Sequence, residues 1–174
     1  MKVIKAKTAG FCFGVKRAVD TVYKQVDTKC GQIYTYGPII HNEEVIKDMR
    51  DKGVIVLRSE EDLDMISQGT VIIRSHGVEK RIYEKIEQKG LRIVDATCPF
   101  VKKIHNIVSE KSGEGFHIII IGNPEHPEVV GIKGWAKDNV TVIQSAEDAE
   151  CFTADRKEKI CIVSQTTFNY NKFK

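Results

Sequence analysis

The stretch Thr8-Ala9-Gly10-Phe11-Cys12-Phe13-Gly14-Val15 marks the change from a short apolar run to an amphipathic helix. The run before it, Val3–Ala6, predicts a strand. The apolar residues after it recur at helical spacing and define one face of a helix: Val15, Ala18, Val19, Val22, Tyr23 and Val26. We therefore expect Cys12 at the carboxyl end of a strand and the amino end of a helix. Free backbone N–H groups there favour a thiolate.

The same alternation of strand and helix runs through the rest of the chain. Val- and Ile-rich runs predict eight strands: Val3–Ala6, Ile33–Tyr36, Val54–Leu57, Val71–Ile73, Leu91–Val94, His117–Ile121, Val140–Ile143 and Ile160–Val163. Asn42, Ser59 and Ser145 each precede acidic residues and predict the starts of three helices between these strands. The sequence thus predicts an α/β fold with parallel or mixed sheets covered by helices on both faces.

Two consecutive units account for the order of these elements. We expect a first α/β unit over residues 1–96 and a second over residues 97–174, which need not be complete. The seam falls near Ala96–Cys98, where a second set of strand–helix pairs begins.

Chemically capable side chains follow the predicted strands. They are Cys12, His41, His76, Cys98, His126 with Glu128, and Thr166 with Thr167. Ligands of open α/β sheets bind beyond the carboxyl ends of the strands, so we expect these side chains to converge on one cleft.

The residue types favour an anion site beside a metal site. His41, His76 and His126 are each predicted just before or within a helix amino terminus, which favours a diphosphate over a metal cage. The thiols of Cys12 and Cys98 suit iron or zinc. Glu128 is a candidate proton donor, although it could also cap the helix that follows it.

Composition excludes several classes of protein. The 174 residues are 41% hydrophobic and 29% charged, with a net charge of +3 spread among acidic residues. This pattern argues against nucleic acid as a partner. The chain contains no apolar run of membrane-spanning length and begins without a signal peptide, so we expect a cytoplasmic protein without a membrane partner. Five cysteines without a C-x-x-C pair argue against a disulfide framework.

Six motifs, in this order, resemble the 4-hydroxy-3-methylbut-2-enyl diphosphate reductase family, also called LytB or IspH. They are Gly-Phe-Cys-Phe-Gly-Val at 10–15, Ile-His-Asn at 40–42, Ser-His-Gly-Val at 75–78, Asp-Ala-Thr-Cys-Pro at 95–99, His-Pro-Glu-Val at 126–129 and Ser-Gln-Thr-Thr at 164–167. The resemblance implies an iron–sulfur oxidoreductase that removes the substrate's allylic hydroxyl as water. The products are isopentenyl and dimethylallyl diphosphate, at the end of the non-mevalonate isoprenoid pathway.

The resemblance also implies roles for individual residues. Cys12 and Cys98 are two of the three ligands of a 4Fe–4S cluster, and the histidines at 41, 76 and 126 bind the substrate, chiefly its diphosphate. Glu128 is the proton donor, and Thr166 and Thr167 contact the substrate, Thr166 by positioning its hydroxyl. The electron donor is a protein such as ferredoxin or flavodoxin.

The family's third cysteine ligand and its Ser/Asn-rich loop have no counterpart in this sequence. Cys161 lies inside an apolar run and Cys151 follows an acidic turn, so neither is placed for ligation. We therefore expect two of the three units of a pseudo-threefold enzyme, and no turnover by these 174 residues alone.

Two other functions compete with the reductase: a zinc-dependent hydrolase that uses two cysteines and a histidine, and a non-catalytic diphosphate-binding module. Several residues also have a purely structural interpretation. We expect Cys30, Cys151 and Cys161 to pack as small apolar groups, His105 to pack or to support the site, and His117 to be structural. The Lys16-Arg17 pair is expected on the solvated surface, or as a docking point for an acidic electron carrier.

Overall fold

The computed structural model describes residues 2–7, 9–28, 31–155 and 157–169. The first part of the chain forms α1 (Phe13–Asp27), β1 (Ile33–Tyr36), α2 (Glu43–Asp51), β2 (Ile55–Leu57), α3 (Glu60–Asp64), β3 (Thr70–Ile73), α4 (Lys80–Gln88) and β4 (Arg92–Asp95). The second part forms α5 (Pro99–Gly113), β5 (His117–Ile121), α6 (Pro127–Lys133), β6 (Val140–Ile143), α7 (Ala146–Cys151) and β7 (Ile160–Ser164).

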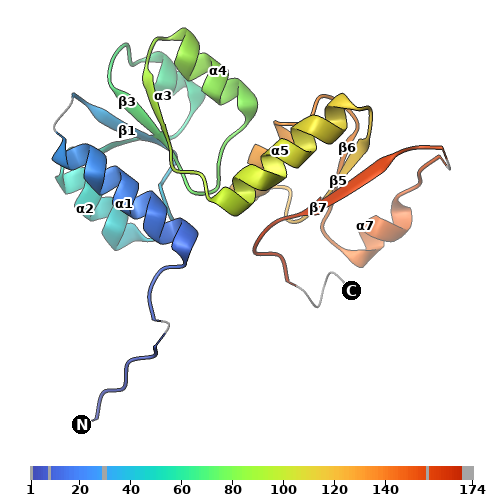
Figure 1. The fold of residues 1–174 in the computed structure, drawn as a ribbon, viewed down its shortest axis with the longest axis horizontal. Helices are drawn as coiled ribbons and strands as arrows, with labels where there is room; N and C mark the ends of the chain where they lie inside the picture. Colours follow the sequence, from blue (N-terminus) through green and yellow to red (C-terminus); the bar gives the residue numbers. More distant parts are fainter. Residues whose placement is uncertain (1, 8, 29–30, 156, 170–174) are drawn as a thin grey trace.

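The strands form two separate parallel sheets, which lie side by side in Figure 1. The first has the order β2-β1-β3-β4, and the second has the order β6-β5-β7. Every pairing is parallel, so the carboxyl ends of the strands in each sheet share one edge. The predicted α/β class with parallel sheets is confirmed.

The first sheet is covered on both faces. One core cluster joins α1 and α2 to the sheet, with Ala18, Val22 and Met49 packed on Ile33 and Ile72. A second cluster on the opposite face joins α3 and α4 to the sheet and includes Leu63, Ile82, Ile86, Val71 and Ile73. Because helices cover both faces of the sheet, consecutive residues of the inner strand β3 are buried whichever face they point to. All four residues of β3 are buried, and three of them are apolar.

The second sheet is covered less evenly. Val108 of α5 and Ile132 of α6 pack on Ile118 and Ile120, while α7 and its C-cap Phe152 lie toward the other face, where Phe152 contacts the His117 ring. The side chain of Ile162 in the edge strand β7 is 58% exposed. The three-layer arrangement is therefore complete around the first sheet and partial around the second.

Helix starts follow the capping residues that the sequence indicates. The side chains of Asn42, Ser59 and Ser145 accept hydrogen bonds from the backbone N–H of Val45, Asp62 and Asp148, respectively. Each bond satisfies an N–H group that has no partner within its own helix.

The predicted strand at Val3–Ala6 is wrong. Residues 2–7 belong to no helix or strand, and the side chains of Val3 and Ile4 are 81% and 79% exposed. Figure 1 shows this segment extending away from the sheets. A strand exists only by pairing with a neighbour, and these residues have no neighbouring strand in the described part of the chain. Cys12 is consequently the N-cap of α1 without a preceding strand.

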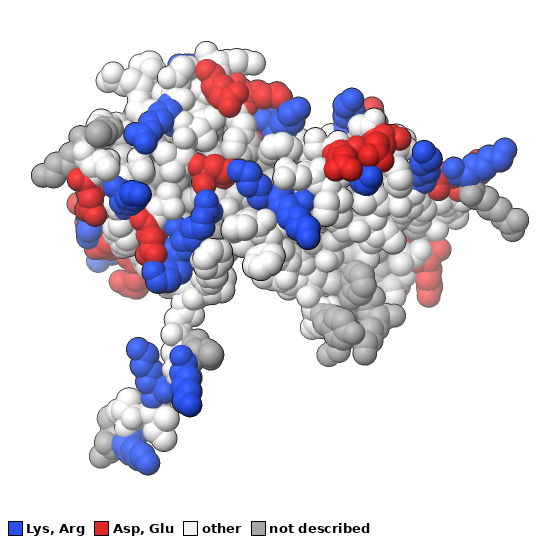
Figure 2. Space-filling view, viewed as in Figure 1, with Lys and Arg blue, Asp and Glu red and all other residues white. Residues whose placement is uncertain are grey.

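Basic and acidic side chains are interspersed over the face drawn in Figure 2, with basic side chains also on the projecting N-terminal segment. Among the described residues, no helix combines the length and apolar character needed to cross a lipid bilayer.

Candidate functional site

Three histidines from three different strand ends form one cluster, which we call the histidine triad: His41 after β1, His76 after β3 and His126 after β5. Their ring centroids lie 4.8 Å apart for His41 and His76, 5.5 Å for His76 and His126, and 6.4 Å for His41 and His126. Their ligand atoms all lie within 4.8 Å of one another. The parallel sheets thus bring together side chains that are far apart in the sequence, as the strand-end pattern predicts.

The loops that carry the triad differ in their geometry. His41 precedes Asn42, the N-cap of α2, and His126 is itself the N-cap of α6. His76 differs from the prediction, because its loop continues through Gly77 to Glu79 and α4 begins only at Lys80. The positive φ of Gly77, 70°, turns the chain immediately after His76.

Burial affects the charge of two members of the triad, His76 and His126. Desolvation lowers the pKa of His76 to about 4, and repulsion from Arg74 and from the protonated forms of His41 and His126 acts in the same direction. Burial also lowers the pKa of His126, against a smaller opposing effect of Glu128. At neutral pH His76 and His126 are therefore uncharged hydrogen-bonding groups.

One contact fixes the tautomer of His126. Its Nδ1 accepts a hydrogen bond of 3.1 Å from the backbone N–H of Glu128, so the proton of the neutral ring is on Nε2. That N–H is a donor suited to an anionic oxygen.

Arg74 supplies a permanent positive charge beside the triad, two residues before His76. Its side chain is partly buried, its Nε donates to the carbonyl oxygen of Gly77 at 3.4 Å, and its guanidinium lies against Gly37. It forms no ion pair with any carboxylate of the described residues. A partly buried cation without an anionic partner is suited to binding an anion from solution.

Glu128 and Thr166 form the second element of the site. The Glu128 side chain is 1% exposed, and its carboxylate accepts hydrogen bonds from the backbone N–H of Thr166 at 2.6 Å and from the Thr166 hydroxyl at 2.8 Å. Thr166 itself is exposed. The threonine hydroxyl therefore connects a buried carboxyl group to the surface.

Thr167 belongs to a different contact. Its hydroxyl accepts a hydrogen bond of 2.9 Å from the side-chain amide of Gln165, whose carbonyl oxygen accepts from the backbone N–H of Asn123. This contact joins the segment after β7 to the segment after β5, and it involves neither Glu128 nor the triad.

The two candidate cysteine ligands begin two helices. Cys12 is the exposed N-cap of α1, and the half-buried Cys98 is the N-cap of α5; neither side chain caps its helix through a hydrogen bond. A Cβ atom added to Gly14 would lie only 2.6 Å from Cys98 Sγ, so the first turn of α1 lies directly against the Cys98 thiol. The two cysteine-bearing segments are thus neighbours. Cys151 is exposed, which corrects the expectation that it packs, whereas the partly buried Cys161 packs against the core of the second sheet; Cys30 lies outside the described residues.

Aromatic side chains of the second part of the chain hold the loop of His76. His105 is 1% exposed, stacks on Trp135 at 5.1 Å between ring centroids, and packs against Gly77. Trp135 Nε1 donates to the carbonyl oxygen of Val78 at 2.9 Å. His105 therefore packs, one of its two predicted roles, and it does so against the loop of His76. Its Nε2 is buried without a partner among the described residues. His117 bonds Glu158 and Thr141, a structural arrangement.

The close packing of Gly77 leads to a stability prediction. Replacing Gly77 with Ala places a Cβ about 2.5 Å from His105 Cε1 at a positive φ, whereas Gly90, at a similar φ of 68°, has no atom within 4 Å of such a Cβ. We expect Gly90→Ala to cost about 1 kcal/mol of unfolding free energy, and Gly77→Ala to cost at least about 1 kcal/mol more. Urea unfolding of both variants measures the difference, and equal losses would show that His105 does not restrict this loop.

Sequence reasoning did not single out Arg74 or Trp135, and it placed Arg17 on the solvated surface. Arg17 is half-buried and hydrogen-bonded to backbone oxygens, whereas its neighbour Lys16 is exposed and pairs with Asp20. Arg74 could have been found, because it is the first residue after β3, at the strand end where the site lies. Nothing local to Trp135 indicates its contact with Val78.

The fold and site define a class of protein: a parallel α/β protein with two sheets, whose polar side chains gather at the carboxyl ends of the strands. The chain belongs to the LytB protein family, whose model matches residues 3–174. It is 48% identical over 168 residues to the 4-hydroxy-3-methylbut-2-enyl diphosphate reductase of Caldanaerobacter subterraneus, and 44% identical over 170 residues to that of Clostridioides difficile.

Solved structures give the same result. A reductase structure from Plasmodium falciparum, described as that of E-1-hydroxy-2-methyl-but-2-enyl-4-diphosphate reductase, matches 96% of this chain with a TM-score of 0.89 and 31% identity. A second, described as the terminal enzyme of the non-mevalonate pathway, matches 98% with a TM-score of 0.81 and 38% identity. The chain covers 58% and 60% of the two bacterial relatives, and 52% and 60% of the two solved chains. It therefore spans little more than half the length of the proteins it matches.

Proposed function

We propose that this chain is the part of a 4-hydroxy-3-methylbut-2-enyl diphosphate reductase that binds the diphosphate of the substrate and supplies the proton for loss of its hydroxyl group. The observation that carries the proposal is the histidine triad, in which three strand ends from two sheets meet beside Arg74. Membership of the LytB family and the names of its relatives supply the substrate class.

Diphosphate binding follows from the chemistry of these groups. Neutral imidazoles donate hydrogen bonds to phosphate oxygens, and the Nε2 proton of His126 is available because its Nδ1 is already engaged. We propose that Arg74 contributes the permanent charge that pairs with the diphosphate. This arrangement keeps the anion bound at neutral pH without requiring His76 to be protonated.

Proton transfer is assigned to Glu128 and Thr166. Loss of an allylic hydroxyl as water requires a proton on the departing oxygen. We propose that Glu128, protonated on Oε2, is the source: its O–H donates to the Thr166 hydroxyl 2.8 Å away, and Thr166 passes its own proton to the substrate hydroxyl that it positions. The burial of Glu128 leaves the exposed Thr166 as the route to a bound ligand. We give Thr167 the lesser role of fixing this segment through Gln165.

The cysteines fit part of the ligand set of an iron–sulfur cluster. Cys12 and Cys98 lie at the starts of two adjoining helices and so offer two thiol ligands. The helices can approach this closely because Gly14 has no side chain and leaves space for Cys98 Sγ. The described residues bring no third thiolate to them. We propose that Cys12 and Cys98 hold a 4Fe–4S cluster together with a cysteine from the length of the relatives that this chain does not match. When bound, the cluster would supply the electrons of the reduction, received from a protein such as ferredoxin or flavodoxin.

A metal site is the second candidate function of the triad, since three imidazoles within 4.8 Å of one another suit a divalent cation. This set differs from the two cysteines and one histidine of a zinc hydrolase. The partly buried Arg74 favours an anion over a cation at the same place, since a nearby positive charge opposes metal binding.

Isothermal titration of the 174-residue chain with inorganic diphosphate, and separately with Zn²⁺, distinguishes the two. We expect diphosphate to bind, and His126→Gln and Arg74→Met each to weaken it at least about tenfold, as for the loss of a charge-assisted hydrogen bond. Arg92→Met, which removes the same charge from an exposed position at the amino end of β4, is the matched control and should leave the affinity within about twofold. Binding of Zn²⁺ but not diphosphate would contradict the anion assignment.

Activity requires a longer protein. We expect no substrate reduction by the 174-residue chain with a chemical electron donor. We expect turnover by a chimera in which residues 1–174 replace the matching part of the Caldanaerobacter reductase. Measurable reduction by the short chain would refute the division of the site between two parts of a longer protein.

A further inference from the structure

The two cysteine-bearing segments come from distant parts of the sequence, and apolar packing brings them together. Gly14 touches the Cys98 thiol from the first turn of α1, and Ala96 lies in the same core cluster as Ala18 and Val19 of α1. These contacts are apolar and do not fix the direction of the peptide groups between β4 and α5. A polar group that joins α1 to this segment would do so.

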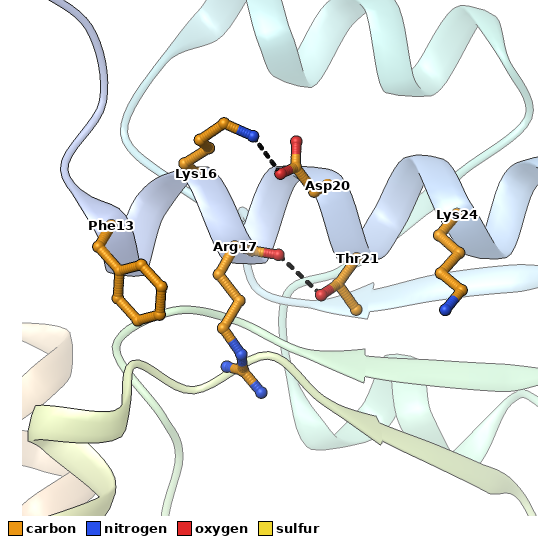
Figure 3. A pocket seen from close by; sticks show the side chains of 6 residues that line it. All are labelled: Phe13, Lys16, Arg17, Asp20, Thr21 and Lys24. Atoms are coloured by element: carbon orange, nitrogen blue, oxygen red, sulfur yellow. Dashed lines mark hydrogen bonds and ion pairs between the residues drawn. The ribbon is translucent and has the colours of Figure 1, made fainter.

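Arg17 provides that connection. Its Nη1 donates to the carbonyl oxygen of Thr97 at 2.9 Å, and its Nη2 donates to the carbonyl oxygen of Asp95 at 3.3 Å. Figure 3 shows the side chain leaving α1 and reaching the segment that follows β4. It lines a surface pocket of about 360 Å³ together with Phe13, Lys16 and Lys24 among others. Arg17 forms no ion pair within the described ranges, so its hydrogen-bonding capacity is directed at these two carbonyl groups.

The segment that Arg17 holds is also fixed from its other side. Asp95 Oδ1 accepts from the backbone N–H of Thr97 at 2.9 Å and from the Tyr83 hydroxyl at 3.2 Å, and its Oδ2 accepts from Lys102 at 2.7 Å. The N–H of Cys98 donates to the Ser75 carbonyl oxygen at 2.9 Å. Asp95, Tyr83 and Lys102 therefore order the segment within its own sheet and helix. Arg17 alone among these side chains ties it to α1.

We infer that Arg17 is a positioning residue, which holds the peptide of Thr97 and Cys98 in place against the Cys12-bearing end of α1. A guanidinium group is suited to this role because its planar fork donates to two carbonyl oxygens at once, whereas a lysine presents a single charged nitrogen. This inference deepens the proposed function, on which it rests, by naming what keeps the two proposed cluster ligands together.

The test follows the reactivity of the Cys98 thiol in the 174-residue chain, which needs no cluster. Each variant is treated with iodoacetamide under native conditions, and alkylation of Cys98 and Cys161 is followed by mass spectrometry of their peptides. We expect Arg17→Met to raise the alkylation rate of Cys98 about tenfold, the effect of losing a hydrogen bond to a charged donor. Cys161, in the second sheet, serves as the internal reference and should change by less than about twofold. Arg17→Lys should fall between Arg17→Met and the unchanged chain.

Lys24→Met is the matched control, because Lys24 lines the same pocket on the same helix and makes no contact with the 95–98 segment in the described structure. It should leave both rates unchanged. An unchanged alkylation rate of Cys98 in Arg17→Met would overturn the inference. Equal increases at Cys98 and Cys161 would also overturn it, because they would report a loosening of the whole fold. If Arg17→Met does not fold, the ratio of the two rates in Arg17→Lys decides in the same way.

A second measurement separates this inference from the proposed function. Iron and sulfide are reconstituted into the chimera under anaerobic conditions, and the cluster absorbance is followed after a chelator is added. Faster loss in Arg17→Met than in Lys24→Met supports the positioning role. A chimera that binds no cluster with Arg17 intact contradicts the proposed function, and the alkylation rates then decide the role of Arg17 by themselves.

Discussion

Glu128→Gln is expected to lower turnover of the chimera at least about 100-fold, the usual effect of removing a general acid. Glutamine has the size of glutamate and can accept from the Thr166 N–H, while its amide can donate to the Thr166 hydroxyl. It cannot release a proton at neutral pH. The variant should therefore keep its fold, its affinity for diphosphate within about threefold and its cluster, and lose only the chemical step.

Glu125→Gln is the matched control, because Glu125 is an exposed carboxylate three residues earlier, in the loop that precedes α6. It should turn over at the unchanged rate. Comparable turnover by Glu128→Gln and Glu125→Gln would remove the proton-donor assignment, and Glu128 would then be a residue that only fixes Thr166.

The second large effect is a pH dependence of stability that originates at His105. Burial lowers its pKa to about 4, partly opposed by Asp95, against 6.5 for an unperturbed histidine. Between these values the unfolded chain binds a proton that the folded chain does not, so stability falls as the pH falls from about 6.5 to 4. The difference between the two pKa values corresponds to about 3 kcal/mol lost between pH 7 and pH 4.

His105→Phe removes the titrating group and keeps a ring to stack on Trp135. Urea unfolding at pH 7 and pH 4 should therefore show a loss that is about 3 kcal/mol smaller in the variant than in the unchanged chain. The comparison isolates His105 from His76, whose lowered pKa contributes in the same direction in both proteins. Equal losses in the two proteins would mean that His105 is protonated without cost to the fold.

Local pattern was sufficient to predict most of the secondary structure. Ile33–Tyr36, His117–Ile121 and Val140–Ile143 form strands over the predicted residues, because each run is rich in β-branched or aromatic residues that favour a strand and each has a parallel neighbour to pair with. Val3–Ala6 also begins with two β-branched residues, yet composition does not supply a neighbouring strand. The division of the chain at residues 96 and 97 into two domains stays a prediction, although the two sheets separate between β4 and β5.

The candidate site was predictable to the extent that it depends on strand ends. The strand-end rule brought the histidines of the triad to one place without any information on loops. The rule does not apply to Arg17, which lies on a helix. A basic residue next to Lys16 on an amphipathic helix has the local pattern of a surface residue. Only the hydrogen bonds of Arg17 to the carbonyl oxygens of Thr97 and Asp95, in a distant segment, distinguish it from Lys16. The Thr166–Glu128 bond likewise joins two separate strand ends, and the sequence names both residues without pairing them.

A ligand bound by the triad would also link the two sheets energetically. His41 and His76 follow strands of the first sheet, and His126 follows a strand of the second. A ligand held by all three spans the junction, so its binding free energy adds to the cohesion between the sheets. By mass action, a ligand at 100 times its dissociation constant stabilises the bound fold by about 2.7 kcal/mol. Substrate would then act as a structural crosslink as well as a reactant, and slow unfolding in its presence would report how firmly the two halves are joined.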